Sequence, residues 1–123
     1  MPYIYKKGSG QVIETGFKDI PLKLTKENLK ELLTEIINQE TKYTHQDFAN
    51  WCRTHFSKII SQDIELEEIG IDEATYEVIM DVDAQWDLYL VNTFKIDELK
   101  ELDLTKVHLP LEWFKNWLKQ LEQ

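Results

Sequence analysis

Cys52, His55 and His45 are the side chains whose types could serve as a nucleophile with its base or as ligands of a metal ion. Both uses require the groups to converge on one point. The region has helical periodicity, which separates His45 from Cys52 by two turns, about 10.5 Å along the axis, too far to share a metal. Cys52 and His55 belong to the same apolar stripe as Phe48 and Phe56, so we interpret them as core residues.

Asp81 and Asp83 are a second candidate, a pair of carboxylates two residues apart. On a strand both would point the same way and could bind one divalent cation. On a helix they diverge by about 200° and cannot share an ion. Because the surrounding apolar residues recur at helical spacing, the sequence predicts no metal site and no cofactor. A small metal-dependent enzyme or metal-binding protein remains the alternative if this segment is a strand.

The strongest signal in the sequence is the distribution of its charge. The chain has a net charge of −9, and ten acidic residues but no basic residue lie between Asp63 and Asp87. Two interpretations stay open: a solvated face that aids solubility, or a docking surface for a basic protein. The candidate partner-binding residues are the acids at Glu65, Glu68, Asp72, Glu73, Glu77, Asp81, Asp83 and Asp87.

Other motifs are absent from the sequence. It holds four glycines but no Gly-rich phosphate loop, no Gly-x-Ser-x-Gly and no His-Glu-x-x-His, and His108 stands alone. An acidic surface repels phosphates, which argues against direct binding of nucleic acid. The single cysteine favours a reducing, cytoplasmic compartment, and no apolar run is long enough for a membrane span.

The first 24 residues predict extended structure. Tyr3, Ile4 and Tyr5 precede Gly8-Ser9-Gly10, a turn signal, and a second short apolar run follows, so a β-hairpin is expected. Residues 17–24 come close to the alternation of a third extended piece, in which Pro21 suits an edge.

Helices are predicted over residues 25–123. Thr25, Thr44 and Asp72 are candidate N-caps of three amphipathic helices, a short helix is expected at 96–102, and Pro110 suits the first turn of a last one. Few residues join the first two helices, which predicts that they pack as an antiparallel pair, and residues 61–70 are ambiguous between strand and helix. The fold class expected is α+β and predominantly α-helical: an N-terminal β-hairpin or extended segment followed by a four- to five-helix, bundle-like domain, as one domain over residues 1–123.

The function that these features favour is a non-enzymatic, acidic binding protein that neutralises a basic protein partner. Its most concrete form is an immunity protein that inhibits a bacterial nuclease-type toxin, since such a protein is small, acidic and cytoplasmic and needs no catalytic motif. An acidic adaptor or DNA mimic would use the same surface, so the sequence leaves it open as an alternative.

Overall fold

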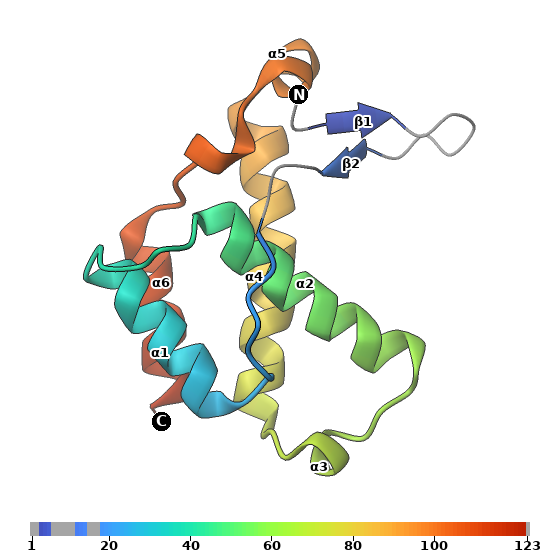
Figure 1. Ribbon diagram of the computed structural model, residues 1–123, viewed down its shortest axis with the longest axis vertical. Helices are drawn as coiled ribbons and strands as arrows, with labels where there is room; N and C mark the ends of the chain where they lie inside the picture. The colour runs from blue at the N-terminus through green and yellow to red at the C-terminus, as the bar shows by residue number, and fades with distance from the viewer. Residues whose placement is uncertain (1–2, 6–11, 15–17, 123) are drawn as a thin grey trace.

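The structure is a computed structural model that describes residues 3–5, 12–14 and 18–122. Its described part is predominantly α-helical (Figure 1). The helices in chain order are α1 (Lys26–Ile37), α2 (His45–Ser61), α3 (Leu66–Ile69), α4 (Glu73–Thr93), α5 (Ile96–Glu101), the 3₁₀ helix η1 (Leu104–Lys106) and α6 (Leu111–Leu121).

Two short strands precede the helices. β1 (Tyr3–Tyr5) and β2 (Val12–Glu14) pair antiparallel, with Ile4 opposite Ile13. The residues expected to form the turn, Gly8-Ser9-Gly10, lie outside the described residues, so the hairpin as a whole stays a prediction.

Residues 18–24 form an irregular segment that packs on α2 and joins no strand, with a tight turn in which the Leu22 N–H donates to the Ile20 carbonyl at 2.9 Å. Ile20 and Leu24 are buried, and the carbonyl oxygen of Leu22 accepts a hydrogen bond of 3.1 Å from the indole nitrogen of Trp51. The backbone N–H of Lys18 donates to the carboxylate of Asp47 at 2.6 Å. Of the alternating apolar residues in this segment, Ile20 and Leu24 are therefore buried and Leu22 is half-buried.

The three predicted N-caps all begin helices. Thr25 Oγ1 accepts a backbone N–H three residues on at 3.0 Å, and Asp72 Oδ1 accepts that of Thr75 at 2.9 Å. Thr44 and Asp47 cap each other reciprocally, at 3.0 and 2.9 Å. Each cap satisfies an N–H that the helix itself leaves without a partner, which is worth about 1 kcal/mol. Pro110 lies one residue earlier than expected, at the N-cap of α6.

The ambiguous stretch 61–70 contains one turn of helix, α3, and no strand. Gly70 ends α3 in the left-handed region, with φ of 74°. This conformation costs any residue with a Cβ about 1 kcal/mol or more, whereas glycine adopts it freely. The chain then reverses through Ile71, which is buried, into the cap of α4.

Helix packing differs from the expected order. α4 lies between α2 and α6 and packs against both, while α1 packs chiefly against α6 (Figure 1). The predicted pairing of α1 with α2 is corrected, because the apolar stripe of α1 faces the last helix rather than the next one. Buried side chains of these four helices fill the core, among them Leu29, Leu33, Phe48, Trp51, Val78, Val82, Trp86, Phe114 and Trp117.

Trp113 lies at the edge of this core. It is half-buried and packs its ring edge-on against Tyr89 of α4, with centroids 5.8 Å apart. None of the helices in the described ranges combines the length and the apolar character that a membrane span needs.

Candidate docking surface

Asp81 and Asp83 point to opposite flanks of α4. Asp81 Oδ2 accepts a hydrogen bond of 2.7 Å from the indole nitrogen of Trp117 on α6, whereas Asp83 Oδ1 accepts one of 2.6 Å from Arg53 Nε on α2. The two carboxylates therefore do not converge, and the alternative metal site loses the geometry that it required. Among the described residues, no group of three or more His, Cys, Asp and Glu side chains is arranged to hold a metal ion.

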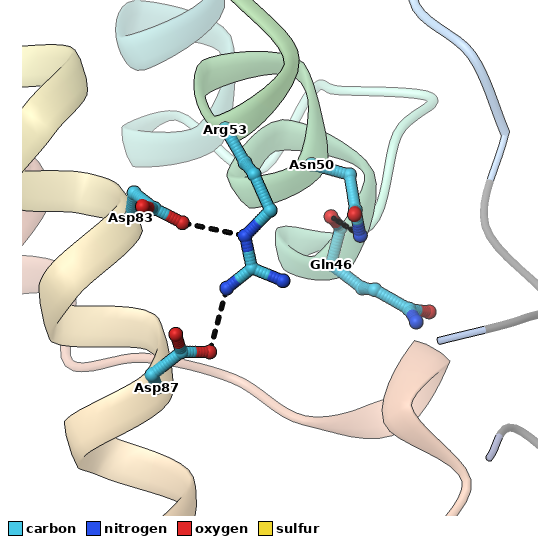
Figure 2. A network of polar contacts seen from close by, with 5 residues as sticks. All are labelled: Gln46, Asn50, Arg53, Asp83 and Asp87. Atoms are coloured by element: carbon cyan, nitrogen blue, oxygen red, sulfur yellow. Dashed lines mark hydrogen bonds and ion pairs between the residues drawn. The ribbon is translucent and has the colours of Figure 1, made fainter. Parts of the chain in front are cut away.

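Arg53 connects α2 to two of the acids of α4 (Figure 2). Its guanidinium binds Asp83 through Nε and Asp87 through Nη2, each at 2.6 Å. Burial by itself would lower the pKa of Arg53, but the hydrogen bonds and charges of the two aspartates outweigh it and raise that pKa. Figure 2 also shows Asn50, one turn before Arg53, donating to the backbone carbonyl of Gln46.

Asp72 has a structural role at the start of α4. Its Oδ1 accepts both the hydroxyl and the backbone N–H of Thr75, and its Oδ2 pairs with Lys26 Nζ of α1 at 2.9 Å. The two bonds from Thr75, followed by that from Lys26, hold the pKa of Asp72 well below its usual range. The carboxylate therefore stays charged through the physiological range and joins α1 to α4.

The predicted site is thus divided into two groups. Asp72, Asp81, Asp83 and Asp87 bind other parts of the chain. The other four acids are exposed, and no salt bridge within the described part of the chain involves them; we call them the acidic end: Glu65, Glu68, Glu73 and Glu77. Glu65 lies immediately before α3 and Glu68 lies on it. Glu73 and Glu77 lie on the first two turns of α4, after the chain has reversed direction (Figure 1).

The cations that pair with three of the eight acids were missed in the sequence because they lie far away along the chain. Arg53 is 30 residues from Asp83, and Lys26 is 46 residues from Asp72. One signal was available, since Arg53 is the only arginine in the chain. The planar guanidinium of arginine directs several N–H donors outward and can bind two carboxylates at once. The ammonium group of lysine is a single point charge without this fixed geometry.

The cysteine and histidine candidates do not form a reactive site. Cys52 is fully buried, and burial, followed by the charge of Asp83, raises the pKa of its thiol, which disfavours the nucleophilic thiolate. His55 is half-buried and packs edge-on against Trp51 at 5.0 Å. The buried His45 accepts a hydrogen bond at Nδ1 from the backbone N–H of Leu109 at 2.8 Å. The interpretation of Cys52 as a core residue is confirmed.

Three surface hollows are lined by described residues, and one of them includes Ile64 and Ile69, which are next to Glu65 and Glu68 in the sequence. Two of about 500 Å³ flank α2, one beside Trp51 and the other beside His45, and a third of about 340 Å³ lies next to Ile59. None of these three includes a residue of the acidic end among its lining. The four glutamates of the acidic end are all exposed, so a macromolecule with a complementary charge can reach them.

Comparisons of the chain with models of known protein families, with curated proteins and with solved structures found no match. The geometry of the described residues is therefore the ground for a functional proposal.

Proposed function

We propose that this protein is a non-enzymatic binding protein that neutralises a basic protein partner in the cytoplasm. The most concrete form is an immunity protein that inhibits a bacterial nuclease-type toxin. The single observation that carries the proposal is the acidic end, four exposed carboxylates without an intramolecular cation in the described structure.

The separation of the acids into two groups supports this proposal. A chain that needed acids only for solubility would gain by pairing them with nearby lysines, as Asp72 is paired with Lys26. The acidic end instead combines like charges over a short distance, which costs free energy of folding. The resulting potential attracts a positively charged surface and speeds its diffusional encounter.

A nuclease is a fitting class of partner because its active site attracts phosphates and is therefore positively charged. A protein that presents carboxylates in place of phosphates can cover such a site. The same potential repels nucleic acid itself, so we propose no direct binding of DNA or RNA.

The test begins with capture of partners from the organism that encodes the chain, followed by purification of the captured protein. We expect a basic protein whose association rate falls steeply as salt is raised, because exposed charges are screened. If the partner is a nuclease, a stoichiometric amount of this protein should abolish its activity on DNA or RNA.

The decisive variant is Glu65→Lys with Glu77→Lys. Neither side chain caps a helix or forms an ion pair in the described structure, so folding should be preserved. We expect the association rate with the purified partner to fall by about tenfold or more. The matched control is Glu31→Lys with Glu122→Lys, which changes the net charge equally at exposed positions of α1 and at the end of α6. Equal effects of the two pairs would contradict a role for the acidic end.

A further inference from the structure

Four apolar side chains form a row on the exposed face of α4. Met80, Leu88 and Val91 are 40%, 48% and 61% exposed, and Ala84 between them is also exposed. Residues three or four apart are neighbours on a helix, so this spacing aligns the side chains along one face. Single exposed apolar residues are ordinary on protein surfaces. A continuous row of four is typical of a helix that packs against another helix.

The apolar row continues directly into the acidic end. Glu73 lies four residues before Glu77, which lies three residues before Met80, and both glutamates are exposed. At 100° per residue, the two glutamates and the four residues of the apolar row fall within an arc of about 80° around the helix. One face of α4 is therefore acidic over its first two turns and apolar over the turns that follow.

We propose that this face of α4 is the docking site for an amphipathic helix of the basic partner, an inference that rests on the proposed function. Lysine or arginine side chains at one end of the partner helix meet Glu73 and Glu77. An apolar row on the same helix packs against Met80, Ala84, Leu88 and Val91, over about 16 Å or three turns. The charges set the orientation and the apolar contact supplies the lasting affinity.

The distribution of charge favours a basic partner over a second copy of this chain. In a parallel pair of α4 helices, Glu73 and Glu77 of the two copies would lie against each other. In an antiparallel pair, Glu73 would lie against Val91 of the second copy and would lose water without gaining a cation. Both arrangements are unfavourable, whereas a helix with a basic end satisfies the carboxylates and the apolar row together.

The two flanks of α4 hold this face in place. Asp81 binds Trp117 of α6 on one side, and Asp83 and Asp87 bind Arg53 of α2 on the other. The exposed face between these contacts is therefore carried by a helix that is fixed on both sides. The backbone of this face therefore loses little conformational entropy when a partner helix binds.

The experiment uses two synthetic helical peptides of about 18 residues, long enough for helix formation in the bound state. Each carries four leucines at spacings of three and four, with lysines at the N-terminal end in one peptide and at the C-terminal end in the other. A peptide of the same composition in scrambled order is the control. Binding to the full chain is measured by calorimetry, and a spin label on each peptide locates it through broadening of backbone amide NMR signals.

We expect one of the two lysine orientations to bind better and to broaden the signals from residues 80–91. The double variant Leu88→Gln, Val91→Gln should weaken that binding by about tenfold or more, since both apolar contacts are lost. Ile60→Gln is the matched control, because Ile60 is 59% exposed on α2 and outside the row. Thermal unfolding checks that each variant is folded.

Each other outcome overturns a separate part of the inference. Failure of both peptides to bind, or binding that survives Leu88→Gln with Val91→Gln, overturns docking along α4. If the peptides fail to bind but Glu65→Lys with Glu68→Lys, two exposed acids outside α4, still weakens association with the purified partner, the proposed function stands without this site. A dimer of the chain in light scattering that the leucine and valine changes dissociate would overturn the partner helix in favour of a second copy.

Discussion

A single neutral histidine joins distant parts of the chain. His45 opens α2, and its Nδ1 accepts the backbone N–H of Leu109, 64 residues away, so the ring carries its proton on Nε2. Its ring packs edge-on against Phe114 at 4.6 Å and His108 at 4.8 Å. Burial, followed by the charge of His108, lowers the pKa of His45 to about 4. The neutral imidazole is therefore part of the folded structure.

Stability should fall as the pH is lowered from about 6.5 to about 4. The unfolded chain protonates His45 near its ordinary pKa of 6.5, whereas the folded chain resists protonation until about 4. This difference in pKa adds to the free energy of unfolding above pH 6.5. Up to about 3 kcal/mol of that free energy is lost as the pH falls to about 4. Urea unfolding at a series of pH values measures this loss.

His45→Asn separates this effect from other titrations, because the amide oxygen can accept the Leu109 N–H but does not titrate in this range. Its free energy of unfolding should change less with pH than that of the unaltered chain. His55→Asn is the comparison, since burial also lowers the pKa of the half-buried His55. An unchanged pH dependence in His45→Asn would show that another group is responsible.

At the scale of elements, α2 and α4 are held together by one cation and two carboxylates above a shared apolar core. The side chain of Asp83 is 22% exposed and that of Asp87 is 60% exposed, so the ion pair of Arg53 with Asp87 is the more accessible to water. Water screens the outer pair more strongly, and exposed pairs add little to stability. Removing the partner of the inner carboxylate leaves a partly buried charge without its cation.

Arg53→Met should therefore destabilise the protein by about 1–2 kcal/mol while retaining most of the packing of the side-chain stem. Asp83→Asn should cost more than Asp87→Asn, since Asp83 is the less exposed of the two. Chemical denaturation of the single variants, and of each aspartate variant combined with Arg53→Met, gives the coupling energies. Equal coupling of Arg53 to both aspartates would contradict the assigned difference.

At the scale of the whole molecule, the sequence predicted local features well and distant pairings poorly. The caps at Thr25, Thr44 and Asp72 were predictable because each acts on residues within one turn. The apolar stripe of α4 was predictable from helical spacing alone. The pairing of α1 with α6 was not, because an apolar stripe specifies that a helix is buried but not which helix covers it.

The candidate site shows the same limit. Glu73 and Glu77 were predicted as exposed acids, and they are exposed. Asp81 and Asp83 looked equivalent to them in the sequence, yet they bind Trp117 and Arg53. Helical spacing shows that Asp81 and Asp83 lie on different sides of α4, but it does not show which side chains of other helices bind them.

Removal of α6 should abolish cooperative folding. α6 contributes Phe114, Trp117 and Leu121 to the core and covers α1, so a chain ending at Leu109 leaves apolar side chains of α1 exposed. We expect such a chain to show no cooperative thermal transition and to bind a hydrophobic dye, as loosely packed states do. The full chain with Asn116→Ala and Lys119→Ala, both exposed on α6, should unfold cooperatively. A cooperative transition in the shortened chain would contradict this account of the core.

The packing of α1 on α6 also bears on how the protein is made. A ribosome releases α1 long before α6, and adding residues 38–110 between them takes roughly 4 to 15 seconds at ordinary rates of synthesis. During that interval Leu29, Leu32 and Leu33 lack the helix that covers them in the finished structure. Until α6 emerges, the nascent chain therefore exposes apolar side chains of the kind that chaperones bind.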